Sequence, residues 1–178
     1  MALRKKLPIG IQTFREIRED NHYYVDKTQL ALDLVEGGKH YFLSRPRRFG
    51  KSLFLDTLKE LFEGNEKLFT GLAAEKQWDW SVQYPVLRFS FSGEKYQGAE
   101  GLPNILDTQL TRHEKNFGIP RQFTHAGGRF SDLIVNIHEK TGKPVVILID
   151  EYDKPILDAL AHPEIAQNNR DFLRGFYA

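Results

Sequence analysis

Apolar positions recur in two patterns along this chain, and the two patterns alternate. Short segments rich in apolar residues at 41–44, 86–91 and 145–149 predict β-strands, and the last is an unbroken apolar run that is mostly β-branched, as in a strand buried on both faces. Apolar residues three and four positions apart predict helices before, between and after these segments. The predicted helices span 28–35, 55–62, 105–110, 130–137, 154–162 and 164–177. Strands that alternate with helices indicate an α/β fold with a mostly parallel sheet.

The loop after the first apolar run has the residues of a phosphate-binding loop, RPRRFGKS at 45–52. In such a P-loop, backbone N–H groups surround the phosphates, a lysine reaches the β and γ oxygens, and a hydroxyl binds Mg²⁺. The helix that follows adds an N-terminus that favours an anion. Arg45 stands where the GxxxxGK[ST] pattern has glycine, so a basic turn that merely precedes a helix remains an alternative. The residues expected to bind the nucleotide are Arg47, Arg48, Phe49, Gly50, Lys51, Ser52 and Leu53.

Two carboxylates, Asp150 and Glu151, directly follow the apolar run at 145–149. Open α/β sheets bind ligands at the carboxyl ends of their strands, so this pair is typical of a Walker B element. We expect Asp150 and Ser52 to bind Mg²⁺, and Glu151, with Lys51, to be catalytic by orienting the attacking water. The alternative is that Asp150 caps the next helix and Glu151 complements its dipole. The occurrence of both motifs in the right order favours a nucleotide site.

Three blocks of the sequence resemble the AAA-ATPase-like proteins of bacteria and archaea, relatives of the P-loop ATPases. The blocks are GIQTFREIREDNHYYVDKT at 10–28, SRPRRFGKS at 44–52 and LIDEYDKPI at 148–156. That family itself carries arginine at the position of Arg45. The resemblance implies a three-layer αβα P-loop domain over 1–178 that binds ATP and Mg²⁺, with 1–38 leading into the nucleotide pocket. It also implies that a PD-(D/E)xK nuclease-like domain often follows.

The same resemblance implies a sheet order of 5-1-4-3-2, in which the three apolar runs are strands 1, 2 and 3. Only helical patterns follow strand 3. We therefore expect a fragment that lacks strands 4 and 5, the polar sensor residue and any arginine finger. A nucleic-acid or protein partner would then bind through the missing C-terminal region.

Composition and residue spacing exclude several other classes of protein and of functional site. The net charge of +1 gives no bulk attraction to nucleic acid or to a membrane, and the absence of cysteine excludes disulfides. No segment has the length of a membrane span or the pattern of a signal peptide, so a cytoplasmic protein is expected. The histidines show no zinc-ligand spacing, and Asp153 precedes Lys154 without the spacer that a (D/E)xK nuclease site needs.

The sequence therefore predicts ATP binding and Mg²⁺-dependent hydrolysis. Because an arginine finger is worth about 10³ to 10⁵ in rate, a nucleotide-binding interaction module with little turnover is the main alternative. A small-molecule phosphotransferase ranks last, since nothing in the middle of the chain suggests an acceptor pocket. Phe14, Tyr23 and Tyr24 in the lead-in are candidates for stacking on adenine, although aromatic residues near strands are more often core.

Overall fold

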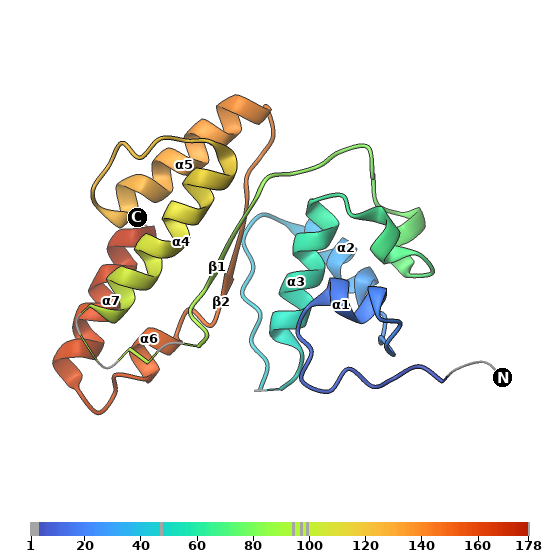
Figure 1. Cartoon of the computed structure of the whole chain (residues 1–178), viewed down its shortest axis with the longest axis horizontal. Coiled ribbons are helices and arrows are strands. Elements are labelled where there is room, and N and C mark those ends of the chain that lie inside the picture. Colours follow the sequence, from blue (N-terminus) through green and yellow to red (C-terminus); the bar gives the residue numbers. More distant parts are fainter. Residues whose placement is uncertain (1–3, 47, 94, 97, 99, 178) are drawn as a thin grey trace. The chain divides into compact units, whose positions relative to one another are not determined.

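The computed structural model describes residues 4–46, 48–93, 95–96, 98 and 100–177 (Figure 1). The chain forms two compact units, and the boundary between them falls after Tyr84. The candidate phosphate loop belongs to the first unit, and the candidate Walker B residues belong to the second.

The first unit is built from helices. These are α1 (Phe14–Glu19), α2 (Thr28–Gly37) and α3 (Lys51–Phe62), followed by two 3₁₀ turns at Glu66–Phe69 and Ala73–Lys76. The fully buried Phe14, Ile17, Leu61 and Phe69 form the centre of its core. The predicted helix at 55–62 is confirmed, and Gly64 follows it with φ of 75°, a conformation that glycine adopts without strain.

The first predicted strand is wrong. Residues 41–44 have no strand structure, and the side chains of Tyr41, Phe42 and Leu43 are 50%, 70% and 40% exposed. In the expected order this strand lies between strands 5 and 4, and the described residues supply neither neighbour. An apolar run without a partner strand has no ladder of hydrogen bonds to join and no second layer to cover it.

The second unit contains both strands of the described chain. These strands, β1 (Val86–Ser90) and β2 (Val146–Asp150), pair in parallel, from Val86 opposite Val146 to Ser90 opposite Asp150. The crossover between them carries α4 (Gly101–Phe117) and α5 (Ala126–Thr141). After β2 come the short α6 (Lys154–Leu157) and α7 (Pro163–Tyr177). The predicted strands at 86–91 and 145–149 are thus confirmed to within one residue, and they are neighbours as the order 5-1-4-3-2 requires.

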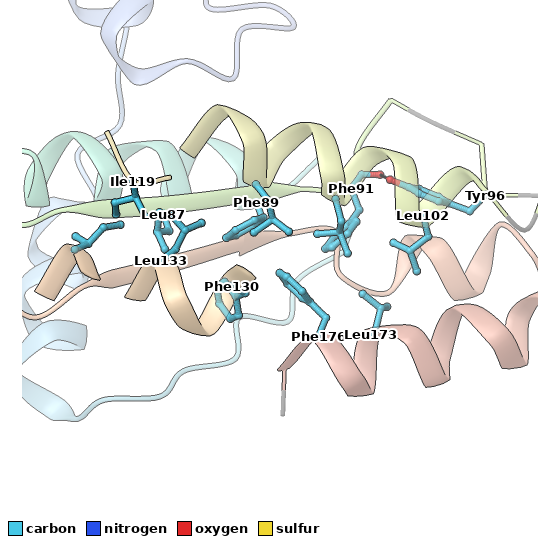
Figure 2. Packing of buried hydrophobic residues seen from close by; sticks show 13 residues of the cluster. Leu87, Phe89, Phe91, Tyr96, Leu102, Ile119, Phe130, Leu133, Leu173 and Phe176 are labelled. Atoms are coloured by element: carbon cyan, nitrogen blue, oxygen red, sulfur yellow. Dashed lines mark hydrogen bonds between the residues drawn. The ribbon is translucent and has the colours of Figure 1, made fainter. Parts of the chain in front are cut away.

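Helices α4, α5 and α7 cover one face of this sheet. Leu87, Phe89 and Phe91 project into the hydrophobic cluster that these helices form, and all three side chains are fully buried (Figure 2). The α/β class is therefore confirmed, while the three-layer P-loop arrangement remains a prediction because the described sheet has two strands. Within the described residues, no helix combines the length and the apolar character needed to cross a membrane.

The two edges of the sheet differ. On β1, the Gln109 side chain accepts a hydrogen bond from Ser90 N at 2.8 Å and donates one to Ser90 O at 3.0 Å. His113, one turn along α4, bonds Arg88 O at 2.9 Å through Nε2. Two side chains of α4 therefore occupy the positions that a neighbouring strand would take.

The outer edge of β2 has no such cover among the described residues. Val146 N donates to Pro85 O, and Asp150 O accepts from Phe91 N, so these residues of β2 face β1. Backbone groups of a strand alternate in direction, so those of Ile147 and Ile149 face away from β1. The backbone groups of Ile147 and Ile149 make no hydrogen bond to another described segment. A strand could extend the sheet here and not beside β1.

Candidate nucleotide site

The described end of the loop before α3 is a left-handed glycine at the start of the helix. Gly50 precedes the helix with φ of 76°, and α3 begins at the next residue, Lys51. Phe54 N donates to Gly50 O at 2.9 Å, which closes the first turn. The free N–H groups of that turn and the positive end of its dipole therefore begin at Lys51, as the sequence predicts.

Lys51 is held by the loop itself. Its Nζ donates hydrogen bonds to Arg45 O at 2.7 Å and to Pro46 O at 3.2 Å. Ser52 and Leu53 lie in the first turn of α3 and are half-buried, while Phe49 is 63% exposed. Arg47, also predicted to bind the nucleotide, lies outside the described residues.

The lead-in aromatic residues differ in exposure. Phe14 is fully buried between Tyr24 and Phe69, with ring centroids 5.1 and 4.9 Å away, so it belongs to the core. Tyr24 lies against Phe14, its hydroxyl is 3.4 Å from Thr57 Oγ1, and burial raises its pKa. Tyr23 is 52% exposed. Of the three candidates for stacking on adenine, Phe14 is thus excluded.

Asp150 ends β2, and Glu151 begins the turn that follows. The Asp150 side chain is buried, whereas Glu151 is exposed. Helix α6 starts only at Lys154, with Asp153 as its N-cap residue. The alternative that Asp150 caps the next helix is therefore wrong, since Asp150 is the last residue of a strand, at the edge where parallel sheets bind ligands.

Two of the predicted site residues have strained backbones. Among the described non-glycine residues, positive φ occurs at Asn21, Arg48 and Glu151, with values of 55°, 67° and 53°. Such a conformation costs on the order of 1–3 kcal/mol and is concentrated at functional sites. Arg48 lies in the candidate phosphate loop, and Glu151 directly follows the candidate Walker B aspartate.

Each unit brings together its own part of the predicted site. Gly50, Lys51 and Ser52 lie together at the start of α3, while Asp150 and Glu151 lie together after β2. Ser90, which was not a predicted site residue, lies opposite Asp150 in the register of the two strands. The assembly of the two parts into one site remains a prediction.

Sequence reasoning also missed Asn169. It is a buried polar residue of α7 whose amide donates a hydrogen bond to Pro155 O in α6. A signal for it was present, because Asn169 is a polar residue in line with Ile165, Leu173 and Phe176 at helical spacing.

The donor chemistry of the predicted metal ligands suits Mg²⁺. Asp150 offers a carboxylate and Ser52 a hydroxyl, the hard oxygen donors that Mg²⁺ prefers. The described residues contain no group of three or more histidine, aspartate or glutamate side chains placed to hold a metal. Mg²⁺ that enters with a nucleotide is held by one or two protein oxygens together with the phosphates, so it needs no such group.

Comparisons with known proteins agree with the motifs. The model of the family described as Predicted AAA-ATPase matches residues 8–178. An uncharacterized protein in the vnfD 5′ region of Azotobacter chroococcum mcd 1 is 57% identical over 176 residues, which is 98% of this chain and 34% of that protein. The chain thus spans about a third of the length of this curated relative. No solved structure matches the chain.

Proposed function

Because the chain belongs to the predicted AAA-ATPase family, we propose that it binds ATP through the loop at 45–53 and hydrolyses it with Mg²⁺. One structural observation supports the phosphate site above the others. Helix α3 begins at Lys51 directly behind Gly50, whose left-handed backbone turns the chain into the helix. A lysine, a hydroxyl and free helix N–H groups therefore share one helix terminus.

Backbone and side-chain groups of the loop bind the phosphates in different ways. The backbone N–H groups from Arg48 to Leu53 donate to phosphate oxygens, and Lys51 Nζ neutralises the charge of the β and γ groups. The side chains of Arg47 and Arg48 add cations at the loop, where guanidinium groups bind phosphate in a bidentate manner. To reach the nucleotide, Lys51 must release the carbonyl oxygens of Arg45 and Pro46.

The acidic pair acts on the metal and on water. Asp150 and Ser52 would hold Mg²⁺, which neutralises charge that develops on the phosphate oxygens when it is bound. Glu151 orients the attacking water and accepts its proton, because its carboxylate is exposed and lies next to Asp150. The strained backbone of Glu151 supports a functional role for its position.

The test is calorimetric titration of the chain with Mg-ATP, combined with a phosphate-release assay. We expect Lys51→Ala to abolish binding, because the phosphates lose their cation, and Glu151→Gln to bind ATP but release no phosphate. Lys67→Ala is the matched control, since Lys67 is an exposed lysine in the 3₁₀ turn Glu66–Phe69, and it should bind as the unaltered chain does. Circular dichroism verifies that each variant is folded.

Three outcomes would change the conclusion. A folded chain that binds no ATP would contradict the nucleotide site. Tight binding without phosphate release by the unaltered chain would support the alternative, an interaction module that uses the nucleotide as a ligand. A phosphorylated small molecule in place of free phosphate would instead identify a phosphotransferase.

A further inference from the structure

A buried asparagine on α7 bonds the short helix α6, which directly follows the turn that carries Glu151. Asn169 is 3% exposed, and its Nδ2 donates a hydrogen bond to Pro155 O at 2.8 Å. The same nitrogen lies 3.4 Å from Tyr96 O, in the loop after β1. One side chain thus joins the segments that leave the carboxyl ends of both strands, where a parallel sheet binds its ligands.

Pro155 O has no partner within its own helix. Helix α6 has four residues, Asp158 N donates to Lys154 O, and Ala159 N donates to Ile156 O. Pro155 O, which lies between those two acceptors, therefore receives no backbone hydrogen bond, and a buried carbonyl oxygen without a donor is unfavourable. Asn169 supplies the missing donor.

Tyr96 and Lys154 strengthen the same connection. Tyr96 is fully buried, and its hydroxyl donates to Phe91 O at 3.1 Å (Figure 2). Lys154 Nζ lies 5.2 Å from the centroid of the Tyr96 ring and forms an ion pair with Asp158 at 2.5 Å. Lys154 N in turn donates to Glu151 O at 3.0 Å and closes the turn. A continuous set of contacts runs from Asn169 to the backbone of Glu151.

Glu151 needs such support because its left-handed backbone is strained. A residue keeps a strained conformation only where its surroundings leave it no alternative. Without Asn169, the orphaned carbonyl of Pro155 would favour rearrangement of α6, and the turn between Glu151 and Lys154 would lose its anchor.

We propose that Asn169 is a positioning residue that fixes the direction of the Glu151 carboxylate; its catalytic consequence rests on the proposed hydrolysis of ATP. Asn169 touches neither water nor nucleotide in this role. It acts on the rate of hydrolysis and leaves ATP affinity nearly unchanged, since the phosphate-binding residues lie in the other unit.

The experiment compares Asn169→Asp with Asn168→Asp in the full chain. The two residues are neighbours on α7 and receive the same change of charge, but Asn168 is exposed. The rates are compared at pH 8, toward the alkaline end of the series, because the introduced carboxyl group, when ionised, has no proton to donate and repels two carbonyl oxygens. We expect hydrolysis to fall on the order of 10-fold to 100-fold, the effect of a small displacement of a reacting group, with ATP affinity within about threefold. Asn168→Asp should change neither.

A pH series separates positioning from general damage. Burial raises the pKa of a carboxyl group, and its protonated form can donate to Pro155 O. The rate deficit of Asn169→Asp should therefore shrink as the pH falls from 8 to 6, while its ATP affinity stays constant. Equal rates for this variant and the unaltered chain, or a parallel loss of affinity and rate, would overturn the proposal.

A second variant and a second measurement cover the remaining outcomes. Asn169→Ser removes the amide without adding a charge, and should give a smaller loss of rate if Asn169→Asp fails to fold. The Lys154 N–H donates a hydrogen bond to Glu151 O, so its rate of hydrogen exchange measures the stability of the turn in the absence of nucleotide. A chain that does not hydrolyse ATP overturns the proposed function. In that case, unchanged exchange in the Asn169 variants would overturn the positioning role, and faster exchange would sustain it.

Discussion

At the scale of single residues, Glu151 has a backbone that glycine adopts more readily. Its φ of 53° is unfavourable for a side chain with a Cβ. We predict that Glu151→Gly raises the free energy of unfolding by about 0.5–1 kcal/mol, because release of strain outweighs the added freedom of the unfolded chain. Urea unfolding measures the change, and phosphate release should be lost in the same variant.

Asp153, two residues further along, provides the control for that substitution. Its φ is −84°, and its side chain makes no capping hydrogen bond to α6. Asp153→Gly should lower the free energy of unfolding by about 0.5–1 kcal/mol, since glycine adds entropy to the unfolded chain and relieves nothing in the folded one. Shifts of the same sign in both variants would show that Glu151 is not strained.

His113 should make stability depend on pH. Burial lowers the pKa of His113, and the nearby Arg112 lowers it further, while its hydrogen bond to Arg88 O opposes the shift. The folded chain thus binds a proton less readily than the unfolded chain, in which a histidine has a pKa of about 6.5. The stability that the neutral imidazole contributes is present above about pH 6.5 and is lost as the pH falls toward the lower pKa of the folded chain.

The variant His113→Gln isolates that contribution. Glutamine does not titrate, and its amide can donate to Arg88 O as Gln109 donates to Ser90 O. We expect the free energy of unfolding of the unaltered chain to fall more between pH 7 and 5.5 than that of His113→Gln, in urea unfolding at each pH. Identical slopes for the two chains would mean that His113 titrates normally in the fold.

At the scale of elements, Gly127 on α5 lets that helix lie close to the backbone of α7 at Gly175. A Cβ on Gly127 would lie 2.5 Å from Gly175 O, a backbone atom that cannot move alone. A Cβ on Gly175 would meet no other atom within 4 Å. We predict that Gly127→Ala destabilises the chain by about 1–3 kcal/mol, as overpacking does. Gly175→Ala should stabilise it by about 0.5–1 kcal/mol through helix propensity.

Thermal or urea unfolding of both variants tests this asymmetry. The two substitutions have the same chemistry, so a difference in sign can come only from the surroundings of each glycine. Destabilisation by both would indicate that α7 also packs closely at Gly175. Stabilisation by both would place α5 and α7 further apart than in the structure.

At the scale of the whole molecule, the uncovered edge of β2 should promote self-association. Ile147 is 38% exposed, and its backbone groups face away from β1. An exposed apolar strand edge pairs with other chains, and a lysine on the edge prevents this. We predict that Ile147→Lys lowers concentration-dependent light scattering. Val135→Lys replaces a 50% exposed residue on α5, away from any edge, and should not. Equal light scattering from the unaltered chain and both variants would contradict self-association through the edge of β2.

The sequence predicted the second unit better than the first. The segments at 86–91 and 145–149 could be identified because both are rich in apolar residues and the second is wholly apolar, and their pairing followed from the family resemblance. The run at 41–44 has the same local pattern, yet a strand requires neighbours, which no local pattern reports. Lys51, Asp150 and Glu151 could be singled out from motif spacing. The loop carbonyls that hold Lys51, and the role of Asn169, depend on contacts between distant residues.

The side chains that cover β1 limit how copies of this chain can polymerise. A fibre that grows by strand addition needs two reactive edges on each copy, so that every copy can join a neighbour on either side. In the described part of the second unit, Gln109 and His113 already occupy the outward backbone groups of Ser90 and Arg88. Among the described residues of this unit, strand addition is therefore confined to the edge of β2, so pairing of copies through this sheet would end at two copies.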